Sequence, residues 1–239
     1  MPDLAFPADG GVAKGYLSMP GHAGIGAPAG RWPGVVVIHE LFGLTDDIRR
    51  HADRLAAAGY VAFAPDLYAG KSWMRCVRGA IQQLRSGSGP AFTAIEAARA
   101  WLASRPDCSG KTGVIGFCMG GGFALLCAPR DGFAAASVNY GDVPADAEAA
   151  LEGACPVVGS FGARDPMGVK PPERLEKALT ALGVPHDVKV YPGAGHRFMS
   201  ETSGALAPLA SFARMGYRED AAEDSWRRIL AFFGDHLRG

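Results

Sequence analysis

Residues 111–127 read KTGVIGFCMGGGFALLC, and this stretch decides the fold. It begins as an apolar run that is typical of a buried strand, passes through glycines, and continues as an apolar run typical of a helix. At the junction, residues 116–120 (GFCMG) have the pattern G-x-S-x-G with cysteine in the place of serine. Small residues two positions before and after Cys118 allow a strand and a helix to pass closely around a sharp, strained turn. The pattern therefore predicts a strand, a tight turn that carries Cys118, and a helix.

Cys118 stands at the start of the predicted helix, and this position suits a nucleophile. Backbone N–H groups and the helix dipole at a helix N-terminus favour the negatively charged thiolate over the thiol. The thiolate is the form of cysteine that attacks carbonyl carbon atoms. We therefore expect Cys118 to be a catalytic nucleophile. A structural cysteine in a glycine-rich turn is the alternative interpretation.

Strand-like and helix-like segments alternate on both sides of this stretch. Residues 14–19 are expected to form an edge strand, and residues 21–31 a glycine-rich loop. The other predicted strands are residues 34–39, 60–64, 111–116, 133–139, 156–161 and 186–191. The predicted helices are one capped by Thr45, Asp46 or Asp47 that runs to Ala58, and residues 76–85, 91–103, 117–128, 172–182 and 217–237.

This alternation predicts an α/β fold with right-handed strand–helix–strand units. We expect a mostly parallel central sheet with helices on both faces, in a three-layer α/β/α arrangement. A length of 239 residues suits one domain of this kind, so a single domain over residues 1–239 is expected. In such sheets functional residues gather at the carboxyl ends of the strands. A catalytic residue should therefore follow directly after a predicted strand.

The composition argues against several classes of protein. Lys plus Arg and Asp plus Glu both number 24, so no nucleic acid or anionic membrane is expected as a partner. Apolar stretches fall far short of the ~18–20 residues that span a bilayer. The N-terminal residues lack the pattern of a signal peptide, which predicts a cytoplasmic location. The five cysteines form no C-x-x-C pair, so neither a disulfide framework nor a metal site is expected.

An acid and a histidine follow Cys118 in the places that nucleophilic catalysis needs. Asp165 comes just after the predicted strand at 156–161, and His196 comes just after the strand at 186–191. We expect His196 to take the proton of Cys118 and to deliver a proton to the leaving group. Asp165 is expected to accept a hydrogen bond from the other ring nitrogen and so to fix the tautomer. The alternative interpretations are a turn aspartate and an ordinary loop histidine.

Glu40 follows a buried strand directly, and a carboxylate there needs a partner. The first connection between a strand and a helix in such folds commonly supplies N–H groups that stabilise an oxyanion. We expect the backbone N–H groups of Leu41 and Met119 to form this oxyanion hole. Glu40 would then lie near Cys118, where it could keep the thiol protonated or shuttle its proton. A carboxylate satisfied by loop N–H groups is the alternative.

The chain resembles the dienelactone hydrolase family in motifs that occur in the same order. They are HELFGL at 39–44, GFCMGG at 116–121, GARD at 162–165 and GAGHRF at 193–198. The resemblance runs from about residue 11 to residue 237 and implies the α/β-hydrolase fold. It implies that Cys118, His196 and Asp165 form a catalytic triad with Glu40 as an additional residue. The implied reaction is hydrolysis of an enol lactone through an acyl-thioester intermediate, without metal or organic cofactor.

The sequence departs from the family where substrate is bound. Family members hold a substrate carboxylate with two arginines, one of them a few residues after the histidine. Here that position is Ser200, and the nearby arginine is Arg197. The second arginine follows the P-D-L-Y segment at 65–68. The candidates for substrate contacts are therefore Arg75, Arg78 and Arg197, together with the aromatic residues Phe42 and Phe198, for which packing in the apolar core is an equal alternative.

Two other functions remain open at this point. A broad-specificity carboxylesterase or thioesterase would use the same residues with a different pocket. A non-catalytic, redox-sensing protein would use Cys118 alone and would not need Asp165 and His196 in line with it. The expected partner is a small ester or lactone, and the expected assembly is a monomer or a weak homodimer.

Overall fold

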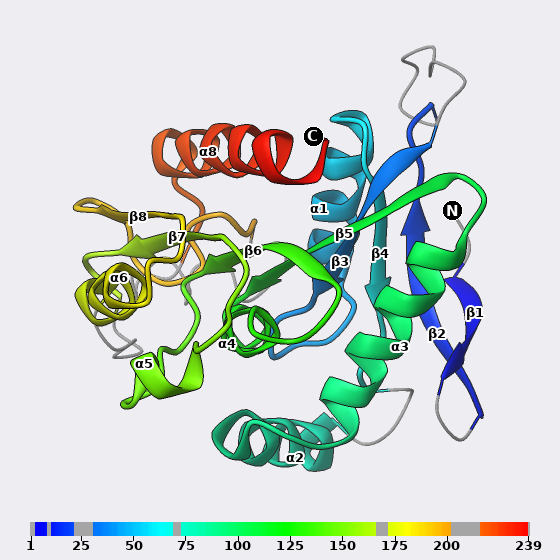
Figure 1. The fold of residues 1–239 in the computed structure, drawn as a ribbon, viewed down its shortest axis with the longest axis horizontal. Coiled ribbons are helices and arrows are strands. Elements are labelled where there is room, and N and C mark those ends of the chain that lie inside the picture. Colours follow the sequence, from blue (N-terminus) through cyan, green and yellow to red (C-terminus); the bar gives the residue numbers. More distant parts are fainter. Residues whose placement is uncertain are drawn as a thin grey trace.

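The computed structural model describes residues 3–8, 11–21, 31–68, 73–165, 172–201 and 216–238. Within these residues, strands form one eight-stranded sheet (Figure 1). From one edge to the other its strands are β1 (Asp3–Ala8), β2 (Gly11–Ser18), β4 (Val61–Pro65), β3 (Trp32–Ile38), β5 (Cys108–Phe117), β6 (Phe133–Asn139), β7 (Val157–Gly162) and β8 (His186–Tyr191).

The strands from β4 to β8 run parallel, and β2 pairs antiparallel with both β1 and β4. The mostly parallel sheet predicted from the sequence is therefore confirmed. The strand predicted at residues 14–19 is present as part of β2, but it is not an edge strand, because β1 pairs with β2 from Asp3 opposite Tyr16 to Ala8 opposite Gly11. The sequence of β1, DLAFPA, contains a proline, which weakens the pattern of a strand.

Helices cover both faces of the sheet (Figure 1). Contacts with the strands place α1 and α8 on one face, and α3, α4 and α6 on the other. Two apolar cores result, and β5 contributes Val114 to one and Ile115 to the other because successive side chains of a strand point to opposite faces. The helices are α1 (Asp46–Ala57), α2 (Trp73–Ser86), α3 (Pro90–Ser104), α4 (Met119–Cys127), α5 (Ala147–Ala150), α6 (Pro172–Ala181) and α8 (Glu219–Leu237).

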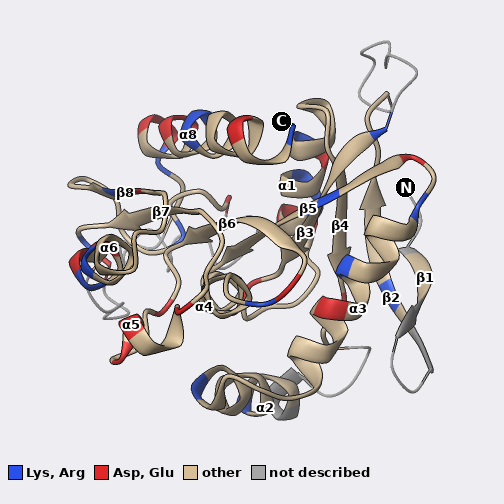
Figure 2. Ribbon diagram, viewed as in Figure 1, with Lys and Arg blue, Asp and Glu red and all other residues tan. Residues whose placement is uncertain are grey.

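Helix α8 is joined to the sheet by charged side chains, and both signs of charge occur along it (Figure 2). Arg228 binds the Asp187 carboxylate at 2.8 Å and donates to the Ser160 hydroxyl at 3.2 Å. Lys189 of β8 contacts Asp224 of α8 at 2.6 Å. Each of these partly exposed pairs contributes about 1 kcal/mol or less, so apolar packing supplies most of the attachment. Among the described helices, none is both long and apolar enough to cross a membrane.

Candidate active site

The turn between β5 and α4 has the strained geometry that the sequence predicts. Cys118 has φ 56° and ψ −121°, a conformation that side-chain-bearing residues rarely adopt. Its N–H donates to the carbonyl oxygen of Asn139 at 3.0 Å, which ties the turn to the end of β6. A Cβ atom at Gly116 would lie 1.9 Å from the carbonyl oxygen of Gly120. Glycine is therefore required at position 116 for the strand and the helix to pass each other.

The structure brings Cys118, His196 and Asp165 into one hydrogen-bonded chain. The Nε2 atom of His196 lies 3.1 Å from the Cys118 sulfur, and its Nδ1 atom lies 2.7 Å from an Asp165 carboxylate oxygen. Cys118 follows the carboxyl end of β5, Asp165 follows β7, and His196 follows β8. The side chains of His196 and Asp165 are only 3% and 6% exposed, so little water competes for their bond.

The surroundings of His196 favour its protonated form. Burial alone lowers the pKa of His196, but hydrogen bonds and charge attraction from Asp165 and Cys118 outweigh burial and raise the pKa to about 9. Because a carboxylate can only accept, Nδ1 must carry a proton, which leaves Nε2 to exchange one with sulfur. The arrangement is therefore able to hold a proton on the imidazole beside the Cys118 sulfur.

Glu40 is buried close to this chain, but its carboxylate is held by residues that follow His196. The Nε atom of Arg197 donates to Oε2 of Glu40 at 2.7 Å, and the Nη2 atom of Arg197 lies 2.6 Å from the same oxygen. The Ser200 hydroxyl donates to Oε1 at 2.8 Å and lies 2.9 Å from the hydroxyl of Tyr140. The ring of Tyr140 packs edge-on against His196 with centroids 5.3 Å apart. Among the described residues, these groups rather than Cys118 are the hydrogen-bonding partners of Glu40.

The two residues expected to form an oxyanion hole lie on elements that meet. Met119 begins α4, so its N–H has no acceptor within the helix. A Cβ atom at Gly120 would lie 2.6 Å from the carbonyl oxygen of His39, so the start of α4 abuts the segment after β3 that carries Leu41. The hydroxyl of Tyr68 donates to the Leu41 carbonyl at 2.9 Å and lies 3.9 Å from the Met119 sulfur.

The structure separates the residues that the sequence suggested for substrate contacts. Phe42 is 47% exposed, and the Arg197 guanidinium lies over its ring, 5.2 Å from the centroid. Arg78 is exposed on α2, and the side chain of Arg75 lies outside the described residues. Of the two interpretations of Phe198, the structure supports core packing, because its side chain is fully buried against Tyr140 and Tyr191. Successive residues of the turn after His196 point in different directions, which adjacency in sequence cannot reveal.

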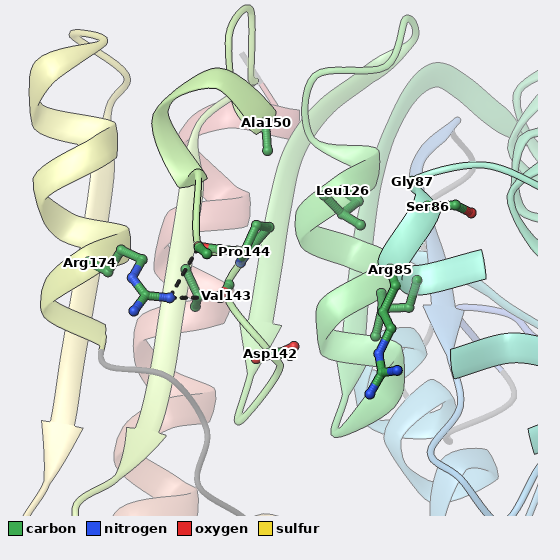
Figure 3. A pocket seen from close by; sticks show the side chains of 11 residues that line it. Arg85, Ser86, Gly87, Leu126, Asp142, Val143, Pro144, Ala150 and Arg174 are labelled. Carbon is green, nitrogen blue, oxygen red and sulfur yellow. Dashed lines mark hydrogen bonds between the residues drawn. The ribbon is translucent and has the colours of Figure 1, made fainter. Parts of the chain in front are cut away.

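A cavity of about 460 Å³ lies elsewhere, over the outer side of α4 (Figure 3). Figure 3 shows Arg174 of α6 and Arg85 of α2 on opposite sides of it. Arg174 donates to the carbonyl oxygens of Val143 and Pro144 at 3.4 and 3.3 Å. Cys118, His196 and Asp165 do not line this cavity, so it is distinct from the candidate active site. In the part of the chain that the structure describes, no cluster of His, Cys, Asp or Glu could hold a metal ion.

Sequence reasoning overlooked two residues that surround the site. Tyr140 follows β6 directly, so the expectation that functional residues come just after strands could have found it. His51 of α1 is buried and stacks on Phe117, the residue before Cys118, with ring centroids 4.1 Å apart. A histidine within a helix gives no sequence signal of that contact. His39 and His51 are both buried.

Comparison with known proteins agrees with these observations. The profile of the dienelactone hydrolase family matches residues 19–237. A protein of Methylorubrum extorquens named "Putative carboxymethylenebutenolidase" is 30% identical over 97% of this chain and 79% of its own length. A Synechocystis protein of the same name is 29% identical over 94% of this chain and 92% of its own. The crystal structure named "Putative Dienelactone Hydrolase" from Klebsiella pneumoniae matches with a TM-score of 0.78 at 26% identity, covering 98% of this chain and 97% of that one.

The family profile spans most of the chain, and the structural match extends over the whole sheet and its helices. The α/β-hydrolase fold expected from the sequence is thereby confirmed. The chain belongs to the dienelactone hydrolase family.

Proposed function

We propose that this protein, a hydrolase of the carboxymethylenebutenolidase type, cleaves a lactone or carboxylic ester with Cys118 as its nucleophile. The observation that carries the proposal is the hydrogen-bonded chain from the Cys118 sulfur through His196 to Asp165. A buried cysteine that serves only packing has no need of an imidazole at 3.1 Å that is oriented by a carboxylate at 2.7 Å. We further propose that residues 1–239 act as one cytoplasmic catalytic domain.

The proposed reaction has two halves. His196 holds the proton of the Cys118 thiol, the Cys118 thiolate attacks the carbonyl carbon, and the resulting oxyanion is bound by the N–H groups of Leu41 and Met119. Because the pKa of His196 is about 9, the imidazole carries a proton at neutral pH and delivers it to the departing oxygen. The carbon–oxygen bond breaks and an acyl thioester remains. His196 then takes a proton from water, hydroxide attacks the thioester, and the acid leaves while sulfur is regenerated.

The substrate class follows from what surrounds the sulfur. This chemistry needs only side chains and water, and it applies to lactones, esters and thioesters alike. Arg197, the residue after His196, is engaged with Glu40, and Ser200 also binds that carboxylate. A substrate carboxylate can use Arg197 only by sharing it with Glu40 or displacing that carboxylate. Glu40 can shuttle a proton to Cys118 only after its carboxylate has released Arg197 and Ser200. We therefore propose that Glu40 takes this role in a step after substrate binding.

The test compares Cys118→Ala with Cys155→Ala, because Cys155 is a partly buried cysteine remote from the proposed chemistry. The substrates are a dienelactone, p-nitrophenyl acetate and an acyl thioester. We expect Cys118→Ala to lose turnover by at least ~10³-fold and Cys155→Ala to retain it. Mass spectrometry of the acid-quenched enzyme should find an acyl group on Cys118. Full activity of Cys118→Ala would exclude the proposal.

The same measurements separate the alternatives. A dienelactone preferred over simple esters by its kcat/KM identifies a dienelactone hydrolase, whereas a flat profile across the panel identifies a broad-specificity esterase or thioesterase. A redox-sensing protein would form oxidised Cys118 with peroxide but would turn over none of the three substrates.

A further inference from the structure

The backbone that carries the Leu41 N–H is fixed through its neighbouring oxygen. The N–H of Leu41 and the carbonyl of Glu40 belong to one peptide unit, and in a planar trans peptide they point in opposite directions. The Glu40 carbonyl oxygen lies 2.7 Å from Nδ1 of His39 and accepts the N–H of Gly43 at 3.1 Å. Because two bonds hold this oxygen, the direction of the Leu41 N–H is determined.

The contacts of His39 specify one protonation state. The Nε2 atom accepts the backbone N–H of Leu67 at 3.2 Å, and an N–H can only donate, so Nε2 carries no proton. The Glu40 carbonyl can only accept, so Nδ1 must carry the proton. His39 is fully buried, and burial lowers its pKa, which agrees with the neutral ring that the two contacts require.

The segment after β4 reinforces the same loop from a second direction. Leu67 supplies the N–H that orients the His39 ring, and the adjacent Tyr68 packs edge-on against that ring with centroids 4.8 Å apart. The hydroxyl of Tyr68 donates to the Leu41 carbonyl at 2.9 Å. The peptide units on both sides of Leu41 are therefore each held by a side chain.

We propose that His39 is a positioning residue, which holds the Glu40–Leu41 peptide through its neutral Nδ1–H tautomer so that the Leu41 N–H faces the developing oxyanion. This inference rests on the proposed function, in which Leu41 and Met119 form the oxyanion hole. An N–H donor contributes to catalysis only when its direction is set before the reaction starts. Loss of one such donor typically lowers kcat by about 10²–10³-fold.

Two substitutions each keep one of the two hydrogen bonds of the His39 ring and remove the other. In His39→Asn, the side-chain amide can occupy the place of Nδ1 and still donate to the Glu40 carbonyl, but it cannot reach Leu67. In His39→Gln, the longer side chain can accept from Leu67, but the donor beside Glu40 is lost. We expect His39→Gln to lower kcat by ~10–100-fold with little change in KM, and His39→Asn to remain within about 5-fold of the wild type.

Two further measurements distinguish positioning of the N–H from general damage. Alkylation of Cys118 by iodoacetamide needs the sulfur and His196 but no oxyanion hole, so both variants should react at the wild-type rate. A trifluoromethyl ketone forms a tetrahedral adduct that does need the hole. Its affinity should therefore fall for His39→Gln in parallel with kcat/KM. Equal kcat and inhibitor affinity in His39→Gln and the wild type, or slowed alkylation in both variants, would overturn the inference.

The wild-type protein offers a test that does not depend on the folding of a variant. Nitrogen NMR of ¹⁵N-histidine-labelled protein should show His39 as the neutral Nδ1–H tautomer from pH 6 to pH 8. A protonated ring or the Nε2–H tautomer would contradict the proposal. The proposed function fails separately, since it requires ester turnover by the wild type and its loss in Cys118→Ala, whichever state His39 adopts.

Discussion

Two buried histidines contact neighbouring residues of the turn after β5, and they differ in almost every electrostatic respect. His196 lies 3.1 Å from the sulfur of Cys118, whereas His51 stacks on Phe117. Each faces an aspartate, at 2.7 Å for His196 and at 3.6 Å for His51. Yet the pKa of His196 is raised to about 9, and the pKa of His51 is lowered to about 4.

The difference lies in how far each aspartate is from the imidazole ring. Burial lowers the pKa of His51, attraction to Asp47 only partly opposes this, and Arg50, Arg54 and Arg197 lower it further. Asp47 already accepts from Arg50 and from the backbone of Glu201 through its Oδ1 atom. Burial therefore decides the charge of a histidine unless a carboxylate lies within hydrogen-bonding distance. The distance to aspartate, rather than its presence, separates the reactive histidine from the structural one.

Replacing His196 and His51 one at a time should have the largest and most unequal effects on kcat/KM. His196→Ala should lower kcat/KM for an activated ester by at least ~10³-fold, because proton transfer to and from the reacting groups is lost. His51→Phe keeps an aromatic ring against Phe117 and should change kcat/KM by less than about 5-fold. Steady-state kinetics check both, with circular dichroism to confirm folding. Comparable losses in the two variants would show that the two histidines do not have separate roles.

Neutralising Asp165 or Asp47 should have a smaller effect on the rate. For Asp165, the pH dependence of the rate should change as well. The rate should fall above pH 9 in the wild type, where His196 loses the proton that it gives to the leaving group. Asp165→Asn removes a hydrogen bond that raises this pKa, so the fall should begin at lower pH and the maximal rate should drop by about 10²–10³-fold. Asp47→Asn is the matched control. A fall at the same pH in wild type and Asp165→Asn would contradict our explanation of the pKa.

The smallest effect concerns stability in acid. The unfolded chain binds a proton on His51 near pH 6.5, but the folded protein does so only near pH 4. Stability from this group is therefore complete above pH 6.5 and is lost as pH falls toward 4, by about 3 kcal/mol in all. Urea denaturation at pH 7 and at pH 5 measures the free energy of unfolding at each pH. Between the two, this free energy should fall less in His51→Phe than in the wild type. Other acid-sensitive groups remain in both proteins, so equal losses would refute the prediction.

Much of the sheet and the chain of three residues could be predicted because the information is local. The GFCMG turn predicts β5 and α4, and Asp165 and His196 each follow a strand. The contacts of Glu40 could not be predicted in the same way. Glu40 and Arg197 are 157 residues apart in sequence, and Arg197 reaches the carboxylate from a residue with φ 61°, which no sequence pattern indicates.

The same limitation explains the errors. Strand β1 could not be predicted because a strand that contains a proline is stabilised by its hairpin partner rather than by its own pattern. The sequence leaves Phe198 open between a substrate pocket and the core, and the fold places its side chain in the apolar core. Both outcomes depend on tertiary packing, which periodicity in a single sequence does not encode.

The backbone at Cys118 would be more relaxed if the residue were glycine. A side chain at φ 56° and ψ −121° costs on the order of 1–3 kcal/mol, whereas glycine adopts positive φ freely. Codons for cysteine and glycine differ by a single nucleotide, so an inactive and better-folded descendant is always one mutation away. If Cys118 acts as we propose, selection for the reaction keeps the sulfur in place, and we expect relatives without the activity to retain this fold with glycine at the bend.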